Sequence, residues 1–133
     1  MGMGTLMTIH GEVRWLVVIL AVVIIIKFAI GWLGKRNYAP LDRTLLTAYT
    51  ILLDINILLG LIVFIFQTAT VTPAMRWEHV GTMLLAVVAA HMTAMWRRST
   101  DSPTKYRNQL LLVALSLLLV FFGVIRLRGG FTF

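Results

Sequence analysis

Four long apolar runs, separated by short polar stretches, make up most of the chain. An α-helix needs about 20 apolar residues to cross a hydrocarbon core of about 30 Å. The pattern therefore predicts four transmembrane helices, at about residues 11–33, 43–66, 76–96 and 107–125. Within the first run, Lys27 lies near the end, where a long side chain can reach the membrane interface. No small-residue cleavage site follows this run, so it predicts a span rather than a signal peptide.

The three connections between the runs are short and polar. They read "GKRNYAPLDR", "QTATVTPA" and "RRSTDSPTKYR" in chain order. Short connections force neighbouring helices to run antiparallel. The sequence therefore predicts an all-α fold, an integral membrane four-helix bundle with up-down-up-down topology, in which residues 1–133 form a single transmembrane domain.

Composition supports a membrane protein and narrows its chemistry. Hydrophobic residues make up 59% of the chain and charged residues 13%, with a mean hydropathy of +0.90. A soluble domain of this size has a far more polar composition. The chain has no cysteine, which excludes disulfides, thiolate metal sites, iron–sulfur clusters and covalent c-type haem. The net charge of +7 comes from residues at the span ends, which favours a role in topology over nucleic-acid binding.

The distribution of basic residues predicts the orientation of the bundle. The first and third connections hold Lys35, Arg36, Arg43, Arg97, Arg98, Lys105 and Arg107, and the opposite side holds Arg14, Arg76, Arg126 and Arg128. Connections rich in lysine and arginine remain in the cytoplasm. We therefore expect a multi-pass protein of a bacterial inner (cytoplasmic) membrane, with both termini outside the cytoplasm.

Two histidines are the first candidates for chemistry. His10 and His79 stand at the starts of the first and third predicted spans, which begin on the same side and are diagonal partners in an up-down bundle. Two imidazoles at similar depth on opposed helices are what bis-histidine ligation of a b-type haem requires. Arg14 and Arg76 lie close in sequence and are candidates to neutralise the haem propionates. The alternative is that both histidines are ordinary polar residues of the wet interface.

A third histidine, His91, leaves several interpretations open. It lies twelve residues after His79, about 18 Å further along a helix and about 120° around it. It is a candidate single axial ligand for a tetrapyrrole, either a chlorophyll-type pigment or a five-coordinate haem. It is also a candidate partner of Asp54, in a pair that relays protons, contacts a quinone or only holds two helices together. Asn56 cannot share the partner of Asp54 and is expected to be structural.

Four motifs carry a resemblance to a known group. "H-x-x-x-R-W-L-V" begins at His10, "Y-x-x-L-D-R" at Tyr38, "L-D-x-x-x-L-L-G-L" at Leu53, and "R-x-E-H-x-x-x-M-L-x-A-V-V-x-A-H" at Arg76. Together they resemble small four-helix bacterial membrane proteins of the cytochrome b-like type. The resemblance implies haem b held by histidines and a role in membrane electron transfer near quinones. Its candidate ligands here are His10, His79 and His91. Di-haem b cytochromes use two ligand pairs, and this chain has only three histidines.

Three functions remain as hypotheses. The first is a haem-b-binding electron-transfer subunit of a larger respiratory or photosynthetic complex that works with quinones. The second is a non-catalytic accessory or assembly subunit of such a complex, holding a pigment, lipid or quinone. The third, a small proton-coupled transporter using Asp54, ranks last because the predicted spans contain no proline. No nucleophile–base set, phosphate loop or metalloprotease motif is present. We therefore expect at most an electron-transfer subunit without its own substrate chemistry, with other subunits and not nucleic acid as partners.

Overall fold

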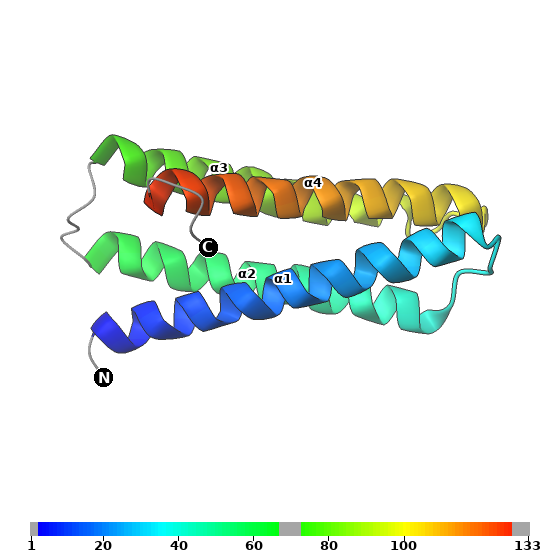
Figure 1. Cartoon of the computed structure of the whole chain (residues 1–133), viewed down its shortest axis with the longest axis horizontal. Helices are drawn as coiled ribbons and strands as arrows, with labels where there is room; N and C mark the ends of the chain where they lie inside the picture. Colours follow the sequence, from blue (N-terminus) through cyan, green and yellow to red (C-terminus); the bar gives the residue numbers. More distant parts are fainter. Residues whose placement is uncertain (1–2, 67–72, 129–133) are drawn as a thin grey trace.

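The fold is a bundle of four antiparallel α-helices (Figure 1). The computed structural model describes residues 3–66 and 73–128. The helices are α1 (Met3–Leu33), α2 (Pro40–Phe66), α3 (Pro73–Met92) and α4 (Ser102–Arg128), and a 3-10 turn, η1 (Thr93–Trp96), continues α3. All four helices are long and apolar enough to cross a membrane. The predicted all-α four-helix membrane bundle is therefore confirmed.

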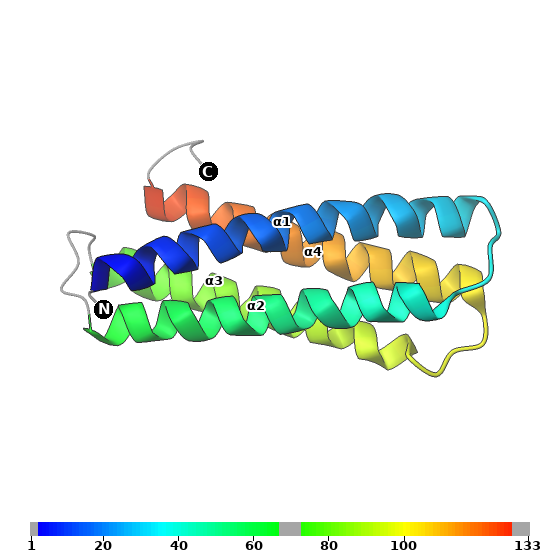
Figure 2. The same ribbon diagram turned by 90° about the horizontal axis from the view of Figure 1, so that it is seen from below.

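Neighbouring helices pack around the bundle in chain order. α1 lies against α2 and α4, and α3 lies against α4 and, less extensively, against α2 (Figure 2). The diagonal pairs are therefore α1 with α3 and α2 with α4. Helix α1 begins and α4 ends at the same end of the bundle, here called the terminal end. The connections 34–39 and 97–101 lie at the opposite end, here called the loop end.

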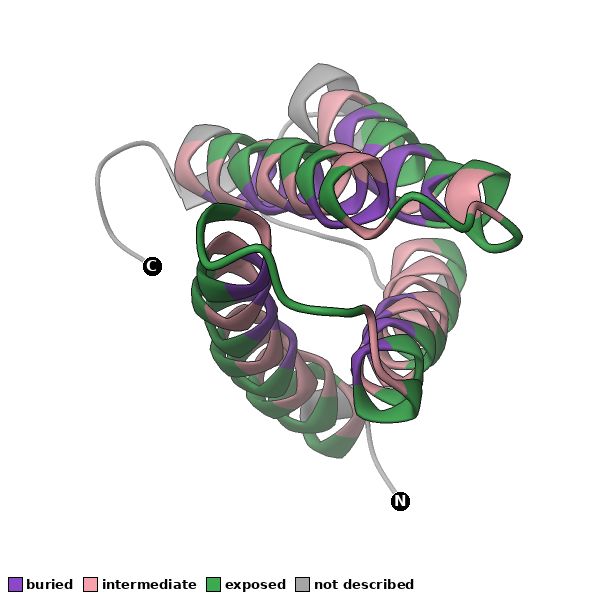
Figure 3. Ribbon diagram, turned by 90° about the vertical axis from the view of Figure 1, so that its right-hand side faces the viewer, coloured by how far each residue is buried: buried purple, intermediate pink, exposed green. Residues whose placement is uncertain are grey.

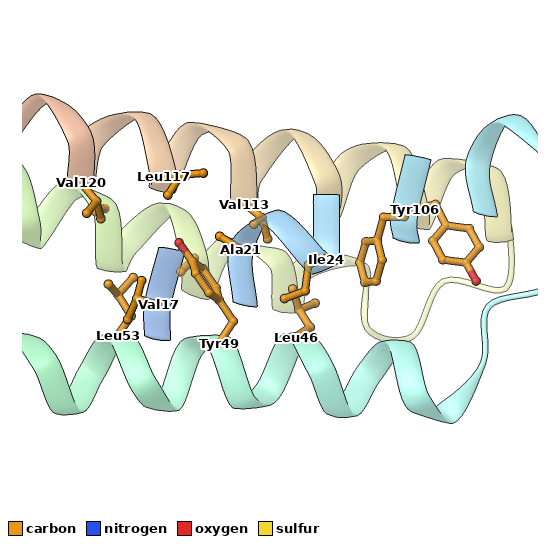
Figure 4. Packing of buried hydrophobic residues seen from close by; sticks show 13 residues of the cluster. Val17, Ala21, Ile24, Leu46, Tyr49, Leu53, Tyr106, Val113, Leu117 and Val120 are labelled. Carbon is orange, nitrogen blue, oxygen red and sulfur yellow. The ribbon is translucent and has the colours of Figure 1, made fainter. Parts of the chain in front are cut away.

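The core is formed by inward faces with helical spacing. On α1 the buried residues recur every three or four positions, which is one face of a helix. The same spacing holds on α2 and α4 (Figure 4). The core residues of these three helices are Val17, Ala21, Ile24, Phe28, Leu46, Tyr49, Leu53, Tyr106, Val113, Leu117 and Val120. The exposed residues lie mainly on the outward faces of the helices (Figure 3). Many of them are large apolar residues, as on lipid-facing surfaces.

Each helix begins before the apolar run that predicted it. α2 begins at Pro40 and α3 at Pro73, each three residues before the predicted start, and α4 begins at Ser102. Proline suits the first position of a helix because its missing N–H would be unpaired there in any case. At α2 the Asp42 carboxylate also accepts the Ala39 N–H, at 2.8 Å, which caps the helix. The apolar runs mark only the hydrocarbon part, and the helices continue into the interface.

Two helix ends at the loop end depart from the simplest geometry. After α1 the Arg36 N–H donates to the Gly31 carbonyl at 2.9 Å and the Lys35 N–H to the Trp32 carbonyl at 3.3 Å, a Schellman pattern. Lys35 takes a φ of 53° there, a position usually given to glycine. α3 ends at Met92 and tightens into η1, where the Thr93 hydroxyl donates to the Ala90 carbonyl at 2.6 Å.

Candidate functional site

The histidine cluster, formed by His10, Arg14, Asn56 and His79, lies at the terminal end. His10 comes from α1 and His79 from α3, two diagonal helices. His79 and Arg14 both lie close enough to His10 to act on it electrostatically, and Arg14 acts on His79 as well. The Arg14 guanidinium also lies 5.7 Å from the centre of the Trp15 ring. The structure thus brings together the two histidines that the sequence paired, whereas the side chain of Arg76 lies outside the described residues.

Glycines of neighbouring helices lie beside both imidazoles. A Cβ atom built on Gly60 of α2 would stand 2.9 Å from His10 Cε1, closer than real Cβ atoms come. One built on Gly123 of α4 would stand 2.6 Å from Met83 Cε and 3.6 Å from His79 Nδ1, the latter an ordinary contact. The His79 Nδ1 atom also lies 3.3 Å from the Gly123 carbonyl oxygen. When Nδ1 carries the proton and donates it to a carbonyl, the free lone pair is on Nε2. In that tautomer Nε2 can bind a metal ion.

The polar atoms of His10 and Asn56 lie next to each other in the histidine cluster, and Asn56 acts on His10 as a hydrogen-bonding neighbour. His10 Nδ1 and Asn56 Oδ1 are buried, and neither has a hydrogen-bond partner of good geometry among the described residues. Such atoms are rare in native structures and cost free energy unless a ligand or water meets them. The cluster thus places two imidazoles from diagonal helices near buried polar atoms. No three histidine, aspartate or glutamate side chains gather as a metal site in residues 3–66 and 73–128.

His91 and Asp54 form a separate pair on the outside of the bundle. The His91 Nε2 atom lies 2.9 Å and 3.0 Å from the two oxygens of Asp54. The His91 side chain is 53% exposed and the Asp54 side chain 45% exposed. Both residues lie within predicted spans, so this pair faces the bilayer or a partner subunit. Among the interpretations of His91 that the sequence left open, the structure shows the geometry of a pair with Asp54. Asp54 and Asn56 have different neighbours, since Asn56 lies beside His10.

A third polar cluster, at the loop end, was not predicted from the sequence. Asp42 is fully buried and forms an ion pair with Lys27 of α1. It also accepts hydrogen bonds from the Tyr106 hydroxyl, at 2.5 Å, and the Ala39 N–H. Lys27 thus binds a carboxylate of the neighbouring helix, where the sequence suggested only a side chain reaching the interface. The available signal was the motif that begins at Tyr38, whose aspartate is Asp42.

Tyr38 extends this cluster towards α4. Its hydroxyl donates to Gln109 Oε1 at 2.7 Å, and Gln109 Nε2 donates to the Thr93 carbonyl at 3.0 Å. Burial, followed by the charge of Asp42, raises the pKa of the Tyr38 hydroxyl above its usual value. Tyr38 therefore stays neutral and serves as a hydrogen-bond donor. These contacts connect the first connection, η1 and α4, and they indicate a structural role at the loop end.

Comparison with known proteins adds no assignment. No family model matches the chain, and no curated protein and no solved structure is significantly similar to it. What defines the class of this protein is therefore its own fold, a small membrane protein with four spans. The resemblance to cytochrome b-like proteins stays a hypothesis that rests on the sequence motifs.

Proposed function

We propose that the protein is a haem-b-binding electron-transfer subunit of a larger membrane complex. The observation that supports this proposal is that His10 and His79, from diagonal helices, lie close enough to act on each other electrostatically. A glycine of a neighbouring helix lies beside each imidazole. His10 and His79 would hold the iron, and Arg14 would neutralise a propionate from one turn away. The haem would supply one-electron redox chemistry, while the protein sets its position and surroundings.

The Asp54–His91 pair adds a candidate contact for a quinone. A quinol reaches its partners by diffusing within the bilayer, and this pair is open to the outside of the bundle. An imidazole held by a carboxylate can accept a proton from a quinol hydroxyl. The pair would then supply the proton step and the histidine cluster the electron step. The pair is half-exposed, whereas the polar atoms of His10 and Asn56 are buried inside the bundle, so separate substitutions address the two sites.

The alternative is an accessory subunit of a similar complex that holds a pigment, lipid or quinone without redox chemistry of its own. The same half-exposed pair favours it, because a polar pair at membrane depth is stabilised when another subunit covers it. Absorption spectroscopy separates the two functions. In the accessory case, the chain would carry no haem, and His91 or the histidine cluster would serve only packing or a pigment.

The test is a dithionite-reduced minus oxidised absorption spectrum of the purified protein in mild detergent. We expect the native chain to give the sharp α band of a b-type haem. His10→Ala and His79→Ala should each remove most of the bound haem, since a bis-histidine site loses an axial ligand. Adding imidazole to His79→Ala should restore part of the band, because the small base can enter the space left by the side chain.

His91→Ala is the matched control, since it removes the only other histidine of the chain. It should retain a full haem content while changing any quinol-dependent reduction rate. A native chain without haem and without extractable tetrapyrrole would reject the proposal. Full haem retention in both His10→Ala and His79→Ala would reject the ligand pair, and loss of haem in His91→Ala alone would move the site to His91.

A further inference from the structure

A small pocket opens at the loop end between α2, η1 and α4. One face of α2 provides residues spaced three and four positions apart, and the facing wall comes from η1, its following residue and α4. The enclosed part has a volume of about 20 Å³, room for one water-sized group. The lining residues are Tyr38, Arg43, Leu46, Thr47, Thr50, Thr93, Ala94, Arg97, Lys105 and Gln109. This pocket, here called the basic pocket, is separate from the histidine cluster and from the Asp54–His91 pair.

Three cationic side chains and no carboxylate line the basic pocket. Lys105 is only 9% exposed. Its ammonium group donates to the Arg97 carbonyl at 2.9 Å and lies 4.0 Å from the centre of the Tyr38 ring. Arg43 is close enough to Lys105 to repel it. Within the described residues, no carboxylate oxygen lies within 4.0 Å of any of these three cations.

The nearest negative charge is already engaged elsewhere. Asp42 is the one carboxylate that attracts Lys105, yet its oxygens bind Lys27, Tyr106 and the Ala39 N–H. The basic pocket therefore keeps an excess of positive charge around a partly buried ammonium. Such a group is costly unless an anion balances it. Arginine offers forked N–H donors that suit phosphate oxygens, and lysine adds a compact point charge.

We propose that the basic pocket binds the phosphate group of an anionic phospholipid. The pocket lies between transmembrane helices, close to Trp96, at the end of the spans where lipid phosphates are found. Basic pockets between membrane helices on the cytoplasmic side recognise acidic head groups. The enclosed volume admits a phosphate oxygen, while the head group and the acyl chains stay outside the pocket.

The experiment measures lipid retention by native mass spectrometry of the full chain, with phosphatidylglycerol, phosphatidylcholine or inorganic phosphate added. We expect preferential retention of phosphatidylglycerol over phosphatidylcholine. The double variant Arg43→Gln/Arg97→Gln should weaken phosphatidylglycerol binding roughly 25-fold, because each arginine contributes about fivefold. The control double variant Arg98→Gln/Arg107→Gln removes the same charge at the same end, outside the pocket lining, and should retain the preference.

A second pair of variants adds charge instead of removing it. Thr47→Glu places a carboxylate at an exposed position of the pocket lining and should also repel the phosphate. Thr44→Glu, on the same helix but outside the lining, should not. Equal retention of both lipids, or equal losses in pocket and control variants, would overturn the proposal. Retention of inorganic phosphate in place of lipid would show a soluble-anion site and would also overturn it.

Discussion

At the scale of single residues, Asp42 is held by three partners, Lys27, Tyr106 and the Ala39 N–H. It is fully buried, and it joins Lys27 of α1 to Tyr106 of α4. A carboxylate buried in this way is tolerated only because a cation and hydrogen-bond donors surround it. Removing one partner leaves the others unpaired, so the consequence should exceed that of an ordinary surface substitution.

Asp42→Asn should destabilise the protein by about 2–3 kcal/mol. This is less than the full cost of breaking a buried ion pair, because the Lys27 side chain is partly exposed to its surroundings. The asparagine keeps the shape but loses the charge that balances Lys27, and its amide group would face donors. Thermal unfolding in one detergent measures the effect. Asp101→Asn is the control and should be nearly neutral, since asparagine caps a helix as well as aspartate does. Equal stability of Asp42→Asn and the native chain would contradict a structural role for the ion pair.

At the scale of the helices, close packing depends on small residues that face large ones. A Cβ atom on Gly31 of α1 would stand 2.5 Å from Tyr106 Cζ on α4. The Tyr106 ring is held by its hydroxyl, which donates to Asp42 at 2.5 Å and also lies 3.1 Å from the Asn37 carbonyl oxygen. It also packs edge-to-face on Phe28, at 5.3 Å between ring centres. Glycine at this position lets α1 and α4 approach each other at the loop end, as small residues do in membrane bundles.

Gly31→Ala should therefore cost about 1–3 kcal/mol, the usual range for overpacking a well-packed core. The ring cannot move without losing its hydrogen bonds, so the added methyl group has no space. Gly81→Ala is a matched control, because nothing lies within 4 Å of a Cβ atom built there. That variant should be neutral or gain up to about 1 kcal/mol from helix propensity. Thermal unfolding of both variants measures the difference. Equal stability of Gly31→Ala and Gly81→Ala would contradict the close approach of α1 and α4 at Gly31.

The sequence predicted the helices well and their cross-links only in part. Apolar runs locate the spans because the hydrocarbon core imposes length and composition. Helix ends depend instead on individual contacts that the apolar pattern does not show. One example is the Thr93 carbonyl, which accepts a hydrogen bond from Gln109, sixteen residues away. The proximity of His10 and His79 could be predicted from the up-down topology, because both begin spans on diagonal helices. The ion pair of Lys27 did not, because neither periodicity nor spacing shows which side chains of two different helices meet.

At the scale of the whole molecule, the two ends of the bundle have different chemistry. The terminal end holds the histidine cluster, and the loop end holds the Asp42 contacts and the basic pocket. Between them, the Tyr49 hydroxyl donates to Ser116 at 2.8 Å, and Ser116 donates to the Ala86 carbonyl at 3.0 Å. These bonds cross the centre of the bundle and connect α2, α4 and α3. The two ends of the bundle therefore differ in their polar sites. The orientation of the protein in the membrane determines which site lies at which side of the membrane.

The excess of basic residues in the first and third connections predicts that the loop end lies in the cytoplasm. The chain has no cysteine, so single substitutions can report orientation without background. Thr5→Cys and Thr100→Cys leave every charge in place, and both positions are exposed. In intact spheroplasts a membrane-impermeant maleimide should label Thr5→Cys, whereas Thr100→Cys should react only after permeabilisation. The opposite pattern would place the basic pocket outside and the histidine cluster inside. It would then require the proposed haem to exchange electrons on the cytoplasmic side.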